Sequence, residues 1–228
     1  MDKRRIIDSH IHIWDFEAHE DWYPGLGPWA AALGKPGHFR TYMPADHHEA
    51  QDIFDLAGVV HVSAVSNPQT YLAEKDWLEG ALDAFPIPAV TIGTFDPLLP
   101  TEEIVQHLEQ LGESPRFRGV RVFFEGFDPG SKVAQTVLSW LDDRHAVFDV
   151  LAGPDNVMEW ASFLSYYPNV TKVLEHLGTP GGTDPESFSV WAESMRQAAE
   201  GTDWLCKFSG LGMHLPDLAP TSVEPWLD

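Results

Sequence analysis

The sequence predicts an α/β fold of the (β/α)8 TIM-barrel type, and three observations support this prediction. Seven short runs rich in β-branched and aromatic residues are spread along the 228-residue chain, and helical patterns separate most of them. Strands that alternate with helices form parallel sheets covered by those helices. The first run lacks the glycine-rich turn that follows the first strand of an open nucleotide-binding sheet. Polar residues instead follow the ends of several runs, as they do in barrels.

The predicted strands are short apolar runs bounded by glycine, proline or polar residues. They occupy residues 6–15, 58–65, 87–95, 117–124, 145–151, 169–176 and 203–210. Residues 101–112 and 131–141 repeat apolar side chains at helical spacing, and Gly112 is placed as a helix stop. Pro154 and Pro185 are each expected to open a further helix.

The chain is predicted to form a single domain over residues 1–228, with one strand fewer than a closed barrel requires. After the seventh run, the segment "LGMHLPDLAPTSVEPWLD" contains three prolines and no β-branched run, so we do not expect it to supply an eighth strand. The sequence therefore predicts a barrel truncated to seven strands, without its C-terminal helix and strand. We expect its sheet to be open between the first and last strands, and the polypeptide to be poorly soluble and nearly inactive.

Composition favours a small-molecule substrate over a nucleic acid or a membrane as partner. The 35 Asp and Glu residues outnumber the 14 Lys and Arg residues, for a formal net charge of −21, whereas both of those partners require cationic patches. Cys206 is the only cysteine, so no intrachain disulfide can form and a cytoplasmic location is expected. Association into a homo-oligomer is left open.

The first predicted strand carries two histidines in the segment "IIDSHIHIWD". Because alternate residues of a strand face the same side, Asp8, His10 and His12 are predicted to project together. Three polar groups on one face indicate a strand that looks into a site. An edge strand with a wetted face is the alternative.

Other candidates lie in or after later predicted strands. His176 ends one of them, and Ser66 follows another. Arg121 lies in an apolar strand, where its planar guanidinium suits a substrate carboxylate; an ion pair with Asp149 on the next strand is the alternative. By contrast, His47 lies in a polar loop and is expected to be solvated.

The segment 16–42 is long and rich in aromatic residues. Long connections of this kind are often lids, so one expectation is that it covers the site. The other is that its aromatic side chains form a small satellite core.

Five segments together resemble the amidohydrolase superfamily: "DSHIHIWD", "RGVRVFF", "FDVLAGPDNV", "VLEHLGTP" and "CKFSGLG". They occur in order from about residue 5 to residue 215. The resemblance is greatest to the amidohydrolase-related (amidohydrolase 2) branch, which includes pyrone-dicarboxylate lactonase and sugar lactonases. It implies a hydrolase with its site at the carboxyl ends of the barrel strands, most readily one that opens a lactone ring with an activated water.

The resemblance also implies roles for individual residues. His10, His12 and His176 are the expected catalytic residues, and in relatives that bind one divalent metal, zinc foremost, they are its ligands. Other relatives hydrolyse lactones without a metal. Arg121 matches a substrate-binding arginine, and Ser66 is assigned the same role. Because few further cations are placed to face the site, we expect a substrate with one carboxylate or none. Two alternatives stay open, a metal-dependent decarboxylase of the same superfamily and an inactive fragment.

Overall fold

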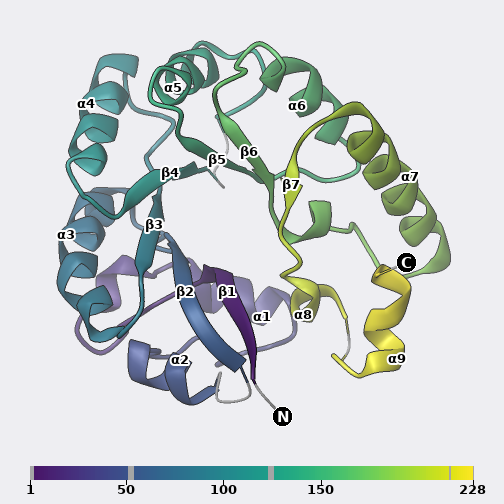
Figure 1. Ribbon diagram of the computed structural model, residues 1–228, viewed down its shortest axis with the longest axis horizontal. Helices are drawn as coiled ribbons and strands as arrows, with labels where there is room; N and C mark the ends of the chain where they lie inside the picture. Colours follow the sequence, from purple (N-terminus) through teal and green to yellow (C-terminus); the bar gives the residue numbers. More distant parts are fainter. Residues whose placement is uncertain (1–2, 51–53, 123–125, 216, 228) are drawn as a thin grey trace. The chain divides into compact units, whose positions relative to one another are not determined.

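The computed structural model of the protein describes residues 3–50, 54–122, 126–215 and 217–227. The chain divides into two compact units, Met1–Arg121 and Val122–Asp228. All seven strands that the sequence predicts are present, and helices alternate with them (Figure 1). The pairings described within each unit are parallel. The fold class is therefore the predicted one, α/β of the TIM-barrel type with seven strands.

The first unit is a parallel sheet of four strands with helices along it. Its strands, paired in chain order, are β1 (Arg4–Ile11), β2 (Phe54–Val62), β3 (Ala89–Gly93) and β4 (Phe117–Arg121). Its α-helices are α1 (Leu26–Ala32), α2 (Pro44–Ala50), α3 (Tyr71–Ala81) and α4 (Thr101–Gly112), and its 3-10 helices are η1 (Glu20–Trp22), η2 (Pro68–Thr70) and η3 (Leu82–Ala84). Helix α4 has the predicted bounds. The predicted strand 117–124 ends at Arg121, and its Phe123 and Phe124 lie outside the described residues.

One core cluster of the first unit joins the strands β1 and β2 to α3 and η3. Ile11 and Ile13 pack there with Val59, Leu78 and Leu82, all at most 5% exposed. Burying five such aliphatic side chains stabilises this layer by roughly 1.5–3 kcal/mol for each of them.

An irregularity in β1 decides which side chains of that strand face this core. The register with β2 shifts between Asp8 and Ile11, so one extra residue bulges out of β1. The Asp8 carboxylate accepts a hydrogen bond from the backbone N–H of His10 at 3.2 Å. It also lies 3.7 Å from Nε2 of His47 on α2. The prediction that Asp8 projects with the two histidines is therefore wrong, because the bulge turns it toward the helices.

The expectation that His47 is solvated is also wrong. This residue is 3% exposed rather than solvated, and its Nδ1 atom lies 3.2 Å from the Tyr42 hydroxyl. Burial lowers the pKa of His47, although the nearby Asp8 opposes that shift.

The aromatic segment 16–42 packs as a satellite core. The rings of Phe16 and Tyr23 lie 4.5 Å apart, and those of Trp14 and Phe39 lie 4.9 Å apart. Trp14 and Tyr42 exchange backbone hydrogen bonds of 2.8 and 2.9 Å, which closes the segment at its base. These contacts agree with the satellite core, whereas covering of the site by this segment stays a prediction.

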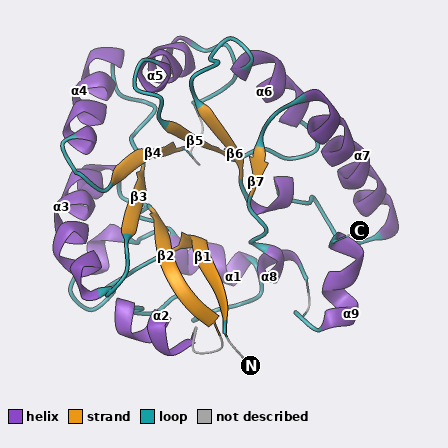
Figure 2. Ribbon diagram, in the orientation of Figure 1, coloured by secondary structure: helices purple, strands orange, loops and turns teal. Residues whose placement is uncertain are grey.

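The second unit repeats the alternation of strand and helix (Figure 2). Its parallel strands are β5 (Val147–Val150), β6 (Thr171–Leu174) and β7 (Leu205–Cys206), paired in that order. Its helices are α5 (Lys132–Asp142), α6 (Val157–Leu164), η4 (His176–Gly178), α7 (Pro185–Gly201), α8 (Leu211–His214), α9 (Pro220–Val223) and η5 (Glu224–Trp226). Side-chain caps fix two helix starts: Ser131 accepts from the N–H of Ala134, and Asp184 accepts from two N–H groups of α7.

The C-terminal part of the second unit is helical. Among the described residues that follow Cys206, none lies in a strand, as the sequence predicts. Leu211, Leu215 and Trp226 instead pack against Trp191 of α7. The open sheet and the single domain stay predictions. In the part of the chain that the structure describes, no helix has both the length and the apolarity needed to cross a membrane.

Candidate active site

His10 and His12 bring two ring nitrogens together at the carboxyl end of β1. Their Nε2 atoms lie 3.2 Å apart, and the two rings are perpendicular. The Nδ1 atom of His12 lies 2.7 Å from the carbonyl oxygen of Val62 on β2. Because a carbonyl oxygen can only accept a hydrogen bond, Nδ1 must carry the proton, and Nε2 of the neutral ring then carries a lone pair. This geometry agrees with the prediction that the two histidines share one side.

The His10–His12 pair fits a divalent metal. Two imidazole nitrogens bound to a tetrahedral zinc at 2.0–2.1 Å lie about 3.3 Å apart, and the observed separation is 3.2 Å. A ligating histidine usually donates its other ring N–H to a carbonyl or a carboxylate, as His12 does to Val62. The residues present therefore suit a zinc-type ion.

Arg121 ends β4 and is 8% exposed. Its Nε atom donates to the carbonyl oxygen of Ser63 at 3.0 Å, and its Nη2 atom donates to the same oxygen. The sequence left open an ion pair with Asp149. The Asp149 carboxylate bonds the ammonium of Lys207, and the pairing of Arg121 with Asp149 stays a prediction.

Glu74 is a buried carboxyl in the first unit that sequence reasoning missed. It lies on α3, is 3% exposed, and accepts hydrogen bonds from the Ser63 hydroxyl and the Ala64 N–H. Burial raises the pKa of Glu74 to about 7, although these hydrogen bonds and Arg121 oppose the rise. A signal was present: Glu74 lies three residues after Tyr71 and four before Leu78, on the buried stripe of its helix.

His61 lies behind the histidine pair and is fully buried. Its ring centre lies 6.4 Å from that of His12. Burial, together with the charge of Arg121, lowers the pKa of His61 to about 3, although a backbone hydrogen bond at Ile13 opposes the shift. It is therefore neutral at physiological pH, as expected for a core histidine.

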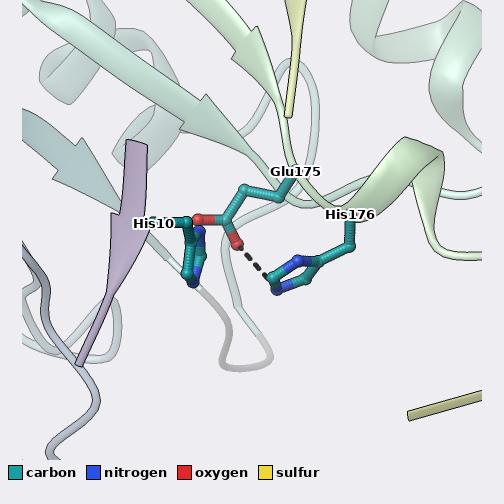
Figure 3. Close-up of side chains that lie close together, drawn as sticks. All are labelled: His10, Glu175 and His176. Atoms are coloured by element: carbon teal, nitrogen blue, oxygen red, sulfur yellow. Dashed lines mark ion pairs between the residues drawn. The ribbon is translucent and has the colours of Figure 1, made fainter. Parts of the chain in front are cut away.

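In the second unit, His176 lies two residues after the end of β6, close to the predicted position at a strand end. Its Nε2 atom lies 3.8 Å from Oε2 of Glu175 (Figure 3), and its Nδ1 atom lies 2.9 Å from the Ser209 hydroxyl. Glu175 is fully buried. The sequence placed His176 but missed the adjacent carboxylate, whose signal was its position beside that histidine in "VLEHLG". Glu175 offers oxygen atoms of the kind that divalent cations accept.

Lys207 supplies the positive charge behind Glu175. It is 6% exposed, and its Nζ atom bonds the Asp149 carboxylate and lies 4.0 Å from Oε1 of Glu175. Burial raises the pKa of Asp149, and the nearby Glu175 raises it further, against the opposing effect of Lys207. The Lys207 ammonium thus lies close to two buried carboxyl groups, those of Asp149 and Glu175.

The backbone around His176 is unusual. His176 and Leu177 have φ values of 51° and 55°, in the left-handed region that side chains rarely occupy. Gly210, at φ 76°, packs against this turn, and a Cβ atom there would lie 2.7 Å from Cβ of His176. The position of the His176 ring therefore depends on a glycine at residue 210.

Ser66 holds a loop in this structure. Its hydroxyl accepts a hydrogen bond from the N–H of Gly25 at 2.9 Å, and its own N–H donates to Trp22. Both partners belong to the aromatic segment 16–42. A contact with substrate stays a prediction for this residue.

Histidines at strand ends, together with buried carboxyl groups and an arginine on an α/β barrel-type fold, are features of metal-assisted enzymes that act on carbonyl groups. Comparison with known families assigns the chain to one of them. Residues 7–227 match the family model described as Amidohydrolase, and the chain belongs to that family.

Individual relatives are distant. An uncharacterised protein of Sinorhizobium fredii, y4mH, is 26% identical over 98% of this chain and 78% of its own length. Among solved structures, an amidohydrolase from Burkholderia multivorans with bound zinc is 23% identical, with a TM-score of 0.68 over 91% of this chain and 71% of that one.

Two further solved structures have the same fold and different names. A probable 2-pyrone-4,6-dicarboxylic acid hydrolase from Acinetobacter baumannii, with citric acid bound, is 15% identical, with a TM-score of 0.61 over 96% of this chain and 74% of that one. A 5-carboxyvanillate decarboxylase from Sphingomonas paucimobilis is 10% identical, with a TM-score of 0.59 over 76% of this chain and 68% of that one. At these identities the likenesses show the fold alone.

Proposed function

We propose that the protein is a hydrolase that opens a lactone ring through attack of an activated water. His10, His12 and His176 are its catalytic histidines and the ligands of one divalent metal, zinc foremost. The observation that carries this proposal is the pair of Nε2 atoms of His10 and His12, 3.2 Å apart. Family membership and the zinc held by the Burkholderia relative support it.

The residues have separate tasks in this proposal. When bound, the metal supplies a Lewis acid that polarises the lactone carbonyl. His12 keeps its proton on Nδ1 against Val62, so its Nε2 lone pair is directed to the metal. Glu175, beside His176, is a further candidate ligand. Arg121, fixed by the Ser63 carbonyl, binds a carboxylate of the substrate through its planar guanidinium.

We propose a sugar lactone or another lactone with at most one carboxylate as the substrate. A ring with several carboxylates would need several cations, and the chain is strongly acidic, with a formal net charge of −21. That charge also disfavours nucleic acids and anionic membranes as partners, and we expect the protein to act in the cytoplasm.

A lactone screen tests this function. Chelator-treated protein is supplied with zinc, or with manganese in a parallel series, and ring opening is followed for sugar and aromatic lactones. Hydrolysis that needs the metal and disappears in His12→Ala is the expected result. Carbon dioxide released from aromatic carboxylic acids, with no lactone opened, would identify a decarboxylase instead. Activity on neither substrate class would indicate a catalytically inactive protein.

A further inference from the structure

The end of β2 holds two side chains of the candidate site through consecutive peptide groups. The carbonyl oxygen of Val62 lies 2.7 Å from Nδ1 of His12. The next carbonyl, that of Ser63, accepts from Nε and Nη2 of Arg121. Any shift or rotation of the Val62–Ser63 peptides would therefore change the orientation of both side chains.

Glu74 fixes this same segment from the helix side. Its carboxyl accepts from the Ser63 hydroxyl and from the N–H of Ala64. A carboxyl that is 3% exposed costs free energy to bury, even when it is hydrogen-bonded. Because neighbouring positions on the same stripe of α3 hold Tyr71 and Leu78, an apolar residue would suit the packing at position 74. The carboxyl therefore has a task other than filling space.

We propose that Glu74 is a positioning residue for the candidate site. Through Ser63 it fixes the two carbonyl groups that hold His12 in its Nδ1-protonated form and hold the guanidinium of Arg121. This inference rests on the proposed function, because that function gives His12 and Arg121 their roles. The geometric part, that Glu74 sets the orientation and tautomer of the His12 ring, stands without any assumption about substrate.

The test uses variants that separate the acceptor from its surroundings. Glu74→Leu keeps most of the volume and removes the acceptor, whereas Glu74→Gln keeps an acceptor oxygen for Ser63. Ser63→Ala removes the donor with a smaller change to the core, in case Glu74→Leu fails to fold. Glu79→Leu is the matched control, because Glu79 lies on the same helix and accepts from Ser114, far along the chain from Ser63.

Two measurements are made on each folded variant. The first is the ¹⁵N chemical shifts of the His12 ring in metal-free protein, assigned with His12→Gln. The second is the zinc dissociation constant by calorimetry, with zinc alone as the probe. Loss of a group that orients a metal ligand typically weakens metal binding by roughly 10–100-fold.

The expected result is a changed His12 tautomer ratio and roughly 10–100-fold weaker zinc binding in Glu74→Leu and Ser63→Ala. Glu74→Gln and Glu79→Leu should stay near wild type in both measurements. Unchanged His12 shifts in Glu74→Leu and Ser63→Ala would overturn the inference. If the wild-type protein binds no zinc, the metal part of the proposed function fails, while the ring shifts still decide the role of Glu74.

Discussion

Nδ1 of His12 lies 2.7 Å from the carbonyl oxygen of Val62. This one contact fixes which ring nitrogen holds the proton, and so leaves Nε2 as the atom able to bind a metal or accept a proton. The contact joins the ends of two adjacent strands, β1 and β2, so the chemistry of His12 depends on the register of the sheet.

A substitution of Arg121 tests the role of this residue in substrate recognition. Arg121→Lys keeps the charge but loses the planar pair of donors. Because a hydrogen bond to a charged group contributes roughly 1.5–3 kcal/mol, KM for lactones that carry a carboxylate should rise by about 10–100-fold. Neutral lactones should be affected much less. Steady-state kinetics on a matched pair of substrates, one acidic and one neutral, measures the difference. An equal rise in KM for both would show that Arg121 acts only on the structure.

Lys207 tests the buried charge cluster of the second unit. Lys207→Met removes the ammonium that bonds Asp149 and lies 4.0 Å from Glu175, which should destabilise the protein by about 3–5 kcal/mol at pH 8. The loss should be smaller at pH 5, because the two carboxyl groups can take up protons once the ammonium is gone. Urea unfolding at both pH values measures this loss of stability. The control is Lys132→Met, because Lys132 is exposed. Equal stability of wild type and Lys207→Met would contradict the importance of the cluster.

Glu74 predicts a dependence of stability on pH. Its pKa is raised in the folded state from 4.5 to about 7, so between these values the folded protein holds a proton that the unfolded chain has released. Stability therefore falls as pH rises from 4.5 toward 7 and is constant above that range. Glu74→Gln removes this titration. The free energy of unfolding of the variant, relative to that of the wild type, should therefore rise by about 3 kcal/mol between pH 4.5 and pH 8. Parallel pH profiles of the two proteins would refute this part of the description.

Gly210 tests how the His176 ring is positioned. Gly210→Ala should cost about 1–2 kcal/mol for the left-handed backbone, and its Cβ would lie 2.7 Å from Cβ of His176. Gly130 is a matched control, with φ 78° and nothing within 4 Å of the Cβ atom that an alanine would add there. Thermal melts should show a loss of stability in both variants, whereas activity should fall in Gly210→Ala alone. A similar loss of activity in Gly130→Ala would assign the effect to backbone strain.

The elements were predictable where local signals set them. Helices α4 and α7 begin and end where their proline, capping residue and glycine place them, since caps and breakers act within one turn. The orientation of Asp8 was not predictable, because strict alternation fails at a bulge that is defined only by pairing with β2. Tertiary contact likewise buries His47 within an otherwise polar sequence.

The candidate site was predictable only where local sequence signals mark its residues. His10, His12 and His176 stand at strand ends in a recognisable motif. The contacts that orient site residues join distant parts of the chain: Arg121 and Ser63 are 58 residues apart, as are Lys207 and Asp149. Periodicity within one element carries no information about such pairs. Two missed residues did leave a sign in the sequence: Glu74 lies on the buried stripe of its helix, and Glu175 lies beside His176.

The most direct test of the proposed function is the rate of lactone ring opening by zinc-supplied wild-type protein and by His10→Ala and His12→Ala. Loss of a metal ligand or of an electrostatic group in the site should lower kcat by roughly 100-fold or more, with zinc binding lost in the same variants and the melting behaviour retained. Ring opening by wild-type protein that collapses in both variants is the predicted result. Turnover by His12→Ala near that of the wild type would contradict the assignment of the active site.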